Sequence, residues 1–123
     1  MPHQVFRVSY AGMPLDHQAI FVETESDGSG QLFEVKGSIL DGMRYEQKTE
    51  KKPEESMSYQ SKILVGMVST EDIAQIDHIC RTIAPPAKQF EGPRILNPHL
   101  PLRRCQEWTA DVITQLKTRG IVV

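Results

Sequence analysis

The sequence predicts an α+β fold, in which a small, mostly antiparallel sheet with an N-terminal β-hairpin packs against two helices. Two short runs of β-branched and aromatic residues flank an Asp-Gly turn within residues 17–36. Two later segments, residues 73–83 and 104–119, carry apolar residues at helical spacing. With 123 residues, we expect residues 1–123 to form a single domain whose core needs no disulfide.

The N-terminal third of the chain has the composition of three strands. Residues 4–10 form the first, and Gly12 and Pro14 predict a turn after it. Residues 17–24 form the second strand, and residues 31–36 return as the third. The turn cluster between these two strands includes Asp27-Gly28, a strong hairpin signal.

The middle of the chain changes character twice. Residues 41–61 are rich in Glu and Lys around Pro53, and we expect a mobile, charged loop there, with a lid as its functional interpretation. Residues 62–68 are mostly apolar, which predicts a strand that is central in the sheet or buried on both faces.

The C-terminal half predicts two helices joined by an irregular segment. Ser69 and Asp72 have the spacing of a capping box, and an apolar stripe follows them up to Pro85-Pro86. The proline-rich residues 87–102 are expected to wrap over the domain. The last helix covers about residues 104–119, with Gly120 as its cap and a short tail packed on the core.

Composition excludes several classes of function. A net charge of −2 offers no overall attraction to nucleic acid, and no window is long and apolar enough to span a membrane. The N-terminus has no signal-peptide core, so we expect a cytoplasmic or nuclear protein that is not secreted and has reduced cysteines. The histidines lack metal-ligand spacing with the cysteines, so neither a metal nor another cofactor is expected.

Cys105, in the segment Arg-Arg-Cys-Gln-Glu-Trp, is the candidate reactive centre. It falls in the first turn of the last helix, where free N–H groups and the charges of Arg103 and Arg104 would favour a thiolate. It also shares a helix face with Trp108, so a buried structural cysteine is an equal alternative. Cys80, in the middle of the preceding helix, is interpreted as structural.

His17 and Glu34 are the candidate partners of the thiol. Alternation places His17, at the start of its strand, on one face with Ala19 and Phe21, where it could serve as the base. Glu34 lies near His17 or Gln18 across the hairpin if the turn centres on residues 27–29. A half-exposed strand-end histidine and an exposed strand glutamate are the structural alternatives.

These segments resemble the circularly permuted papain-like superfamily, which includes NlpC-type and lecithin:retinol acyltransferase-like proteins. The strand His-Gln-Ala-Ile-Phe-Val at residues 17–22 resembles the family's His-Trp-Ala-Ile-Tyr-Val strand, and Cys-Gln-Glu-Trp at residues 105–108 resembles its Cys-Glu-His-Phe helix start. The resemblance implies a cysteine nucleophile at Cys105, a base at His17 and an orienting Glu34. The chain departs from the family at Arg104, Gln18 and Glu34. It also resembles small fungal proteins with the Arg-Cys-Gln-Glu-Trp segment, which implies no function.

We expect a cysteine-dependent hydrolase or acyltransferase acting on an amide, ester or thioester of a small-molecule, acyl or peptide substrate. Donors at Cys105 and Gln106, with Arg103 or Tyr10 nearby, would stabilise the oxyanion, and Arg104 and Trp108 are further candidates for substrate binding. Two alternatives remain open. One is a non-catalytic binding module on the same fold, and the other is a tailoring or cyclising enzyme that uses His17 or Glu34 as acid or base.

Overall fold

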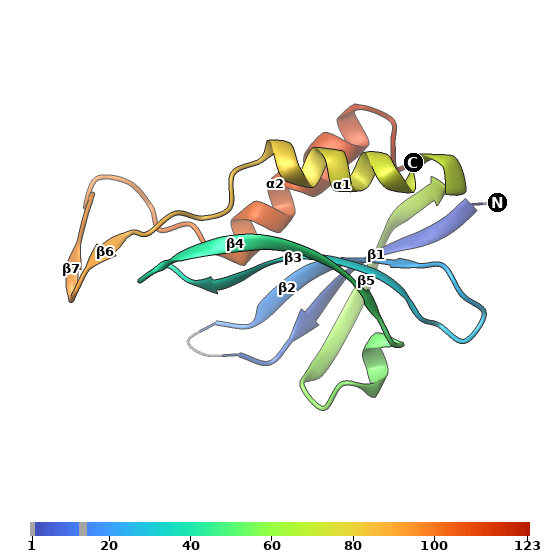
Figure 1. Ribbon diagram of the computed structural model, residues 1–123, viewed down its shortest axis with the longest axis horizontal. Helices are drawn as coiled ribbons and strands as arrows, with labels where there is room; N and C mark the ends of the chain where they lie inside the picture. Colours follow the sequence, from blue (N-terminus) through green and yellow to red (C-terminus); the bar gives the residue numbers. More distant parts are fainter. Residues whose placement is uncertain (1, 13–14) are drawn as a thin grey trace.

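The computed structural model describes residues 2–12 and 15–123, and within them the predicted α+β class is confirmed. Five antiparallel strands form one sheet in the order β4-β3-β2-β1-β5, and both α-helices lie on the same side of it (Figure 1). The strands are β1 (Pro2–Tyr10), β2 (His17–Glu23), β3 (Gly30–Ser38), β4 (Gly42–Glu50) and β5 (Tyr59–Ser69), and the helices are α1 (Ile73–Thr82) and α2 (Cys105–Thr118). The turn expected after β1 includes residues 13–14, which lie outside the described residues.

The predicted hairpin between β2 and β3 is confirmed and tightly built. The Asp27 carboxylate accepts hydrogen bonds from the backbone N–H and the hydroxyl of Ser29, at 2.9 and 2.6 Å. Ile20 pairs with Phe33 in the ladder. At Gly30 an added Cβ would lie 1.9 Å from the carbonyl oxygen of Val22, so only glycine allows the strands to approach this closely.

One core lies between the sheet and the helices. Trp108 is fully buried there, and its indole N–H donates to the carbonyl of Ile83 at 3.0 Å. Gly120, with φ +71°, ends α2 as expected. The tail after it also packs as expected, because Val122 is buried and Val123 exchanges two backbone hydrogen bonds with Met67 of β5.

A second, smaller core lies on the opposite face of the sheet. Its buried members are Phe6, Val8, Tyr10, Ala19, Phe21 and Leu32. The predicted alternation of β2 is therefore correct, and both of its faces are buried, because Ile20 and Val22 contribute to the core under the helices. The sheet thus has no solvated face along β2, and residues 19–22 are apolar throughout.

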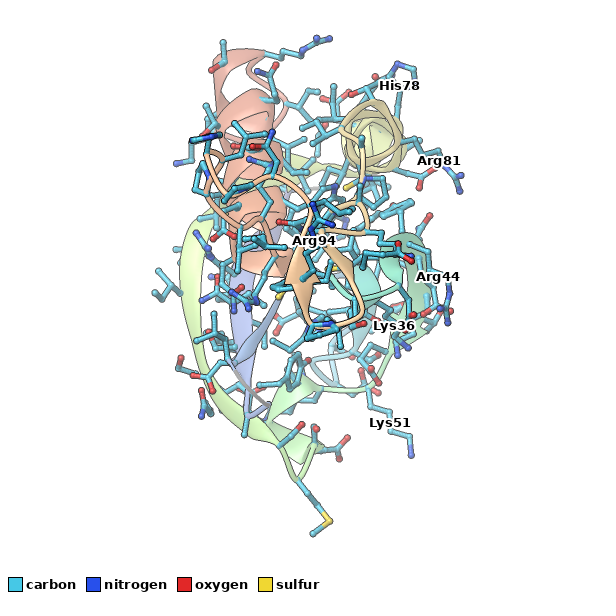
Figure 2. All side chains as sticks on the ribbon, turned by 90° about the vertical axis from the view of Figure 1, so that its left-hand side faces the viewer. Lys36, Arg44, Lys51, His78, Arg81 and Arg94 are labelled. Carbon is cyan, nitrogen blue, oxygen red and sulfur yellow. The ribbon has the colours of Figure 1, made fainter. Side chains whose placement is uncertain are left out.

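The expectation of a loop over residues 41–61 is wrong for most of this range, because residues 42–50 and 59–61 lie in strands. β4 pairs with β3 along nine registered positions, and a 3-10 turn, η1 (Pro53–Glu55), leads across the face opposite the helices to β5 at the far edge (Figure 1). The charges are those of a half-solvated strand, whose alternate residues Met43 and Tyr45 pack on the core. Figure 2 shows Lys36, Arg44 and Lys51 on the outer side of this part of the sheet.

The expectation that residues 62–68 form a central strand is also wrong. They lie in β5, which is an edge strand, and Ile63 and Leu64 are 67% and 53% exposed. The apolar run reflects burial only near its end, where Val68 reaches the core. A continuous apolar run predicts a strand but does not specify its place in the sheet.

Two smaller differences concern the second half of the chain. The helix at residues 73–82 begins through a 3-10 turn, η2 (Thr70–Asp72), and the Ser69 hydroxyl donates to the Asp72 carboxylate at 3.0 Å without forming a capping box. Residues 87–102 carry a two-stranded ribbon, β6 (Phe90–Glu91) and β7 (Arg94–Ile95), which extends beyond the end of the sheet and does not wrap over the domain (Figure 1). Among the described residues, no helix has the length and apolar character needed to cross a membrane.

Candidate active site

The first turn of α2 is docked on the start of β2 by a set of hydrogen bonds. The side-chain amide of Gln106 donates to the carbonyl of Asp16, and the Thr109 hydroxyl donates to the carbonyl of Gln18 at 3.4 Å. Arg7 of β1 donates to the Gln18 side chain at 2.7 Å and to the backbone carbonyl of Gln106 at 3.1 Å. These bonds hold the helix N-terminus against residues 16–18.

Cys105 is the first residue of α2, and its sulfur faces β2. The residue is 6% exposed. The backbone N–H of Gln18 donates to Sγ at 3.5 Å, and Sγ lies 3.9 Å from the carbonyl oxygen of Asp16, so both the thiolate and the thiol have a partner. Burial raises the pKa of the Cys105 thiol, but hydrogen bonds from His17 and from the Gln18 N–H outweigh burial and leave that pKa lowered.

His17 is the first residue of β2. It is hydrogen-bonded to Glu34 and lines the same cavity as Cys105. Its Nε2 lies 2.7 Å from Oε1 of Glu34. Hydrogen bonds to the Cys105 thiol and to Glu34 raise the pKa of His17 to about 9, against an opposing effect of burial. The ring of Tyr10, the cross-strand neighbour of His17, stacks on the imidazole with centroids 6.2 Å apart.

Glu34 is a buried carboxylate, only 3% exposed, with basic groups around it. The amino groups of Lys48 and Lys36 lie 3.4 and 3.6 Å from Oε2, while His17 holds Oε1. Burial raises the pKa of Glu34, but the hydrogen bond and charge of His17 and the two lysines leave it lowered. The carboxylate is therefore charged at neutral pH, and the interpretation of Glu34 as an exposed strand residue is wrong.

The three side chains form a chain of proton-transfer partners: thiol, imidazole and carboxylate. The lowered pKa of Cys105 and the raised pKa of His17 together favour a thiolate–imidazolium pair at neutral pH. A thiolate is the nucleophilic form of cysteine, and an imidazolium can donate a proton to a leaving group. Among residues 2–12 and 15–123, no cluster of three or more His, Cys, Asp or Glu side chains is arranged to hold a metal ion.

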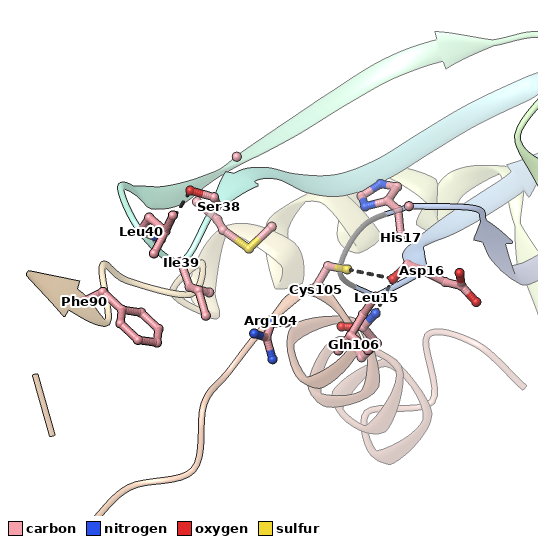
Figure 3. A pocket seen from close by; sticks show the side chains of 13 residues that line it. Leu15, Asp16, His17, Ser38, Ile39, Leu40, Phe90, Arg104, Cys105 and Gln106 are labelled. Carbon is pink, nitrogen blue, oxygen red and sulfur yellow. Dashed lines mark hydrogen bonds between the residues drawn. The ribbon is translucent and has the colours of Figure 1, made fainter. Parts of the chain in front are cut away.

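Cys105 and His17 open onto a cavity of about 380 Å³ (Figure 3). One wall is apolar and is made by Ile39, Leu40 and Met43 from the β3–β4 turn region and by Phe90 of β6. The other wall carries His17, Arg104, Cys105 and Gln106, with Leu15 and Asp16 beside them. The sulfur is thus next to a space large enough for a small organic group, and it is not sealed in the core.

Comparison with known protein families identifies the family of this chain. Residues 5–123 match a family of unknown function, DUF6540. The chain belongs to this family. No curated protein and no solved structure matches it. Membership of DUF6540 assigns no chemistry, so the functional argument rests on the geometry of the site.

Not all of the predicted site residues meet at this cavity. Gln106 and Arg104 line it, as predicted. Arg103 does not, because its guanidinium pairs with Asp111 at 2.5 Å on the outer side of α2. Its proposed oxyanion role is therefore wrong.

Two aromatic residues were also assigned to the substrate site incorrectly. Trp108 is fully buried one helical turn after Cys105 and packs on Tyr45, with ring centroids 5.7 Å apart. Tyr10 stacks on His17 from the second core, and its hydroxyl is buried without a hydrogen-bond partner among the described residues. Tyr10 therefore positions the imidazole and does not reach the cavity.

Several contributors were missed by the sequence analysis. The backbone of residues 16 and 18 supplies the partners of the sulfur, and no side-chain pattern could signal backbone groups. The cavity wall at residues 37–40 and Met43 lies at the tight β3–β4 turn, and of these residues only Met43 falls within the charged loop that the sequence predicted. Phe90 carried a usable signal, because it is the only aromatic residue in the proline-rich segment.

Cys80 provides an internal contrast to Cys105. It is fully buried on α1, and burial raises the pKa of its thiol to about 12. A buried thiol with a raised pKa is inert, which fits the structural interpretation made from the sequence.

Proposed function

We propose that this protein is a cysteine-dependent hydrolase or acyltransferase that acts on an amide, ester or thioester through Cys105, His17 and Glu34. One observation carries the proposal: the imidazole of His17 is hydrogen-bonded to the buried Glu34 carboxylate and lies beside the Cys105 thiol at the wall of a cavity (Figure 3). The order of thiol, imidazole and carboxylate is that of a nucleophile, a base and an orienting group.

The reaction begins with attack by the Cys105 thiolate on the substrate carbonyl carbon. The new S–C bond converts the carbonyl to a tetrahedral oxyanion, and the His17 imidazolium then gives its proton to the leaving amine, alcohol or thiol as the C–X bond breaks. The product of this half is a thioester on Cys105. Water or an acceptor alcohol, amine or thiol then attacks the thioester, with neutral His17 removing its proton. The S–C bond breaks, the acyl product leaves, and the Cys105 thiolate and the His17 imidazolium are restored.

Oxyanion stabilisation comes from the start of α2. The N–H groups in the first turn of a helix have no intrahelical acceptors, and the positive end of the helix dipole lies there. The backbone N–H groups of Cys105 and Gln106 occupy this turn, next to the sulfur. The side-chain amide of Gln106 is bound to the Asp16 carbonyl, so the oxyanion donors we propose are backbone groups.

The permuted papain-like assignment remains part of this proposal. It is supported by the strand that begins with His17, by the helix that begins with Cys105, and by their order along the chain. The alternative of a non-catalytic binding module cannot use residues 41–61 as a charged, loop-like partner site, because residues 42–50 form β4. The alternative that uses His17 or Glu34 without the thiol is distinguished by the experiment below.

We expect iodoacetamide at neutral pH to alkylate Cys105 roughly 100-fold faster than Cys80, because each unit of pKa changes the thiolate fraction tenfold and Cys80 is also buried. His17→Ala should slow the modification of Cys105 at least about tenfold. Incubation with p-nitrophenyl hexanoate should leave a hexanoyl group on Cys105, detected by intact-protein mass spectrometry and absent from Cys105→Ala.

His78→Ala is the matched control, since His78 is an exposed histidine on α1 that does not line the cavity. It should leave the alkylation rate unchanged. Equal slow labelling of both cysteines, or labelling of Cys105 that is insensitive to His17→Ala, would contradict the proposal. Ester hydrolysis that persists in Cys105→Ala would favour the acid–base alternative.

A further inference from the structure

The side chain of Arg104 is the unassigned feature of the cavity. Arg104 precedes Cys105, and both residues line the cavity (Figure 3). No ion pair joins the guanidinium of Arg104 to an acidic group within residues 2–12 and 15–123. A cation beside an apolar wall and without an anionic partner is an arrangement that a bound anion would complete.

The backbone fixes which of the two adjacent arginines faces the cavity. The side chain of Gln89 holds the backbone of Arg103 from both sides, accepting from its N–H at 2.7 Å and donating to its carbonyl at 2.6 Å. Arg103 then turns outward to Asp111. Arg104 is in extended conformation, which sends its side chain to the other side, toward the cavity.

Two acidic side chains lie near this point. The Glu107 carboxylate accepts from the backbone N–H of Arg104 at 2.6 Å, and Glu107 is not among the residues that line the cavity. The carboxylate of Asp16 points away from the cavity in Figure 3, and its Oδ1 accepts from Gln60 at 3.4 Å. The positive end of α2 lies beside Arg104. The facing wall, formed by residues 39, 40, 43 and 90, carries no charge and suits an alkyl or aryl group.

We propose that the substrate carries a carboxylate beside the carbonyl that Cys105 attacks, together with an apolar group. Arg104 binds the carboxylate through charge-assisted hydrogen bonds, and the wall at Leu40 and Phe90 accepts the apolar group. N-acyl amino acids and peptides cleaved next to a free carboxylate have this chemistry. The inference rests on the proposed function, since it concerns the substrate of the same thiol.

The test compares two alkylating reagents of equal size, 2-bromohexanoate and 2-bromohexanamide. In each case the Cys105 thiolate displaces bromide from the α-carbon, so that an S–C bond forms as the C–Br bond breaks. The rate ratio of acid to amide is divided by the ratio measured with free cysteine, which removes intrinsic reactivity. We expect a normalised ratio of at least about ten for the natural chain, the size of effect typical of a charge-assisted hydrogen bond.

Arg104→Gln should lower the normalised ratio at least about tenfold, and Arg104→Lys should retain part of it. Arg103→Gln is the matched control, because Arg103 is paired outside the cavity, and it should change the ratio less than about twofold. Circular dichroism of each variant checks that the fold is kept. The lysine variant preserves the test if the glutamine variant unfolds.

The outcomes separate the two proposals. In one outcome, alkylation of Cys105 is fast and depends on His17 while the normalised ratio is the same in the natural chain, Arg104→Gln and Arg104→Lys. That result would overturn the carboxylate inference and leave the proposed function standing. If neither reagent alkylates Cys105 faster than it alkylates Cys80, both the proposed function and the carboxylate inference are overturned. A ratio that falls in Arg104→Gln but not in Arg103→Gln would support both.

Discussion

At the scale of single residues, the site depends on a buried carboxylate that stays ionised. An isolated buried carboxylate would be protonated, because desolvation disfavours its charge. Glu34 avoids this because His17 hydrogen-bonds one oxygen and two lysines lie near the other. The ionised Glu34 in turn helps to keep His17 protonated, and protonated His17 helps to keep the thiol of Cys105 deprotonated.

This coupling predicts a bell-shaped pH dependence for acyl transfer. Below the lowered pKa of Cys105 the thiolate is protonated and the rate falls, while above about 9 His17 loses the proton that it gives to the leaving group. Glu34→Gln removes a group that raises the pKa of His17, so the alkaline limb should move toward the ordinary value of 6.5. The test is the pH profile of kcat/KM for an ester substrate, with the His17 titration followed by NMR.

Glu46→Gln is the control for this substitution. Glu46 lies opposite Glu34 in the β3–β4 ladder and pairs with Lys36, but it does not contact His17. Its variant should keep the alkaline limb near pH 9. An alkaline limb that does not move in Glu34→Gln would show that Glu34 leaves the proton affinity of His17 unchanged.

At the scale of elements, local signals predicted the β2–β3 hairpin and both helices, because each carries its own periodicity and end signal. Gly28 and Gly120 mark the hairpin turn and the end of α2, and both have positive φ. β4 was missed because its charges resemble those of a solvated loop. Its alternation was nonetheless present, because Met43 and Tyr45, which pack on the core, alternate with the charged Arg44 and Glu46.

The missed strand takes part in the site through Met43, which lines the cavity, and through Lys48, which lies beside Glu34. Lys48→Met should raise the pKa of Glu34, which Lys48 now helps to lower. A lowered carboxyl pKa stabilises the fold above the unfolded value of about 4.5, and this stabilisation is lost as the pH falls through the folded value. We therefore expect Lys48→Met to lose roughly 1 kcal/mol at pH 7, with the loss shrinking as the pH falls below the unfolded value of about 4.5.

Urea unfolding of both proteins at several pH values measures this difference. Lys51→Met is the matched control, since Lys51 is exposed just after β4 and joins no ion pair within the described residues. It should change the stability by less than about 0.5 kcal/mol at every pH. A Lys48→Met loss that is the same at pH 3 and pH 7 would exclude electrostatic support of Glu34.

At the scale of the whole molecule, the site joins elements from opposite ends of the chain. The sulfur of Cys105 accepts from Gln18, 87 residues away, and only tertiary packing can create such a contact. Residue patterns could nominate His17 and Cys105 separately, and the family resemblance supplied the pairing. The same patterns could not show that Arg104 lines the cavity while Arg103 does not, or that Trp108 lies in the core. The direction in which each of these side chains points depends on how α2 packs on the sheet.

The two cores share a single sheet, which predicts that they unfold together. Trp108, the only tryptophan, reports on the core under the helices, while Leu32 is buried in the core on the other face. Leu32→Ala should cost about 2–5 kcal/mol. If unfolding is cooperative, Trp108 fluorescence and far-UV circular dichroism should show the same loss. Leu40→Ala, at an exposed residue outside both cores, should shift neither transition by more than about 0.5 kcal/mol. A fluorescence transition that stays in place while the dichroism transition moves would show that the helix layer, and the cysteine it carries, is stable without the second core.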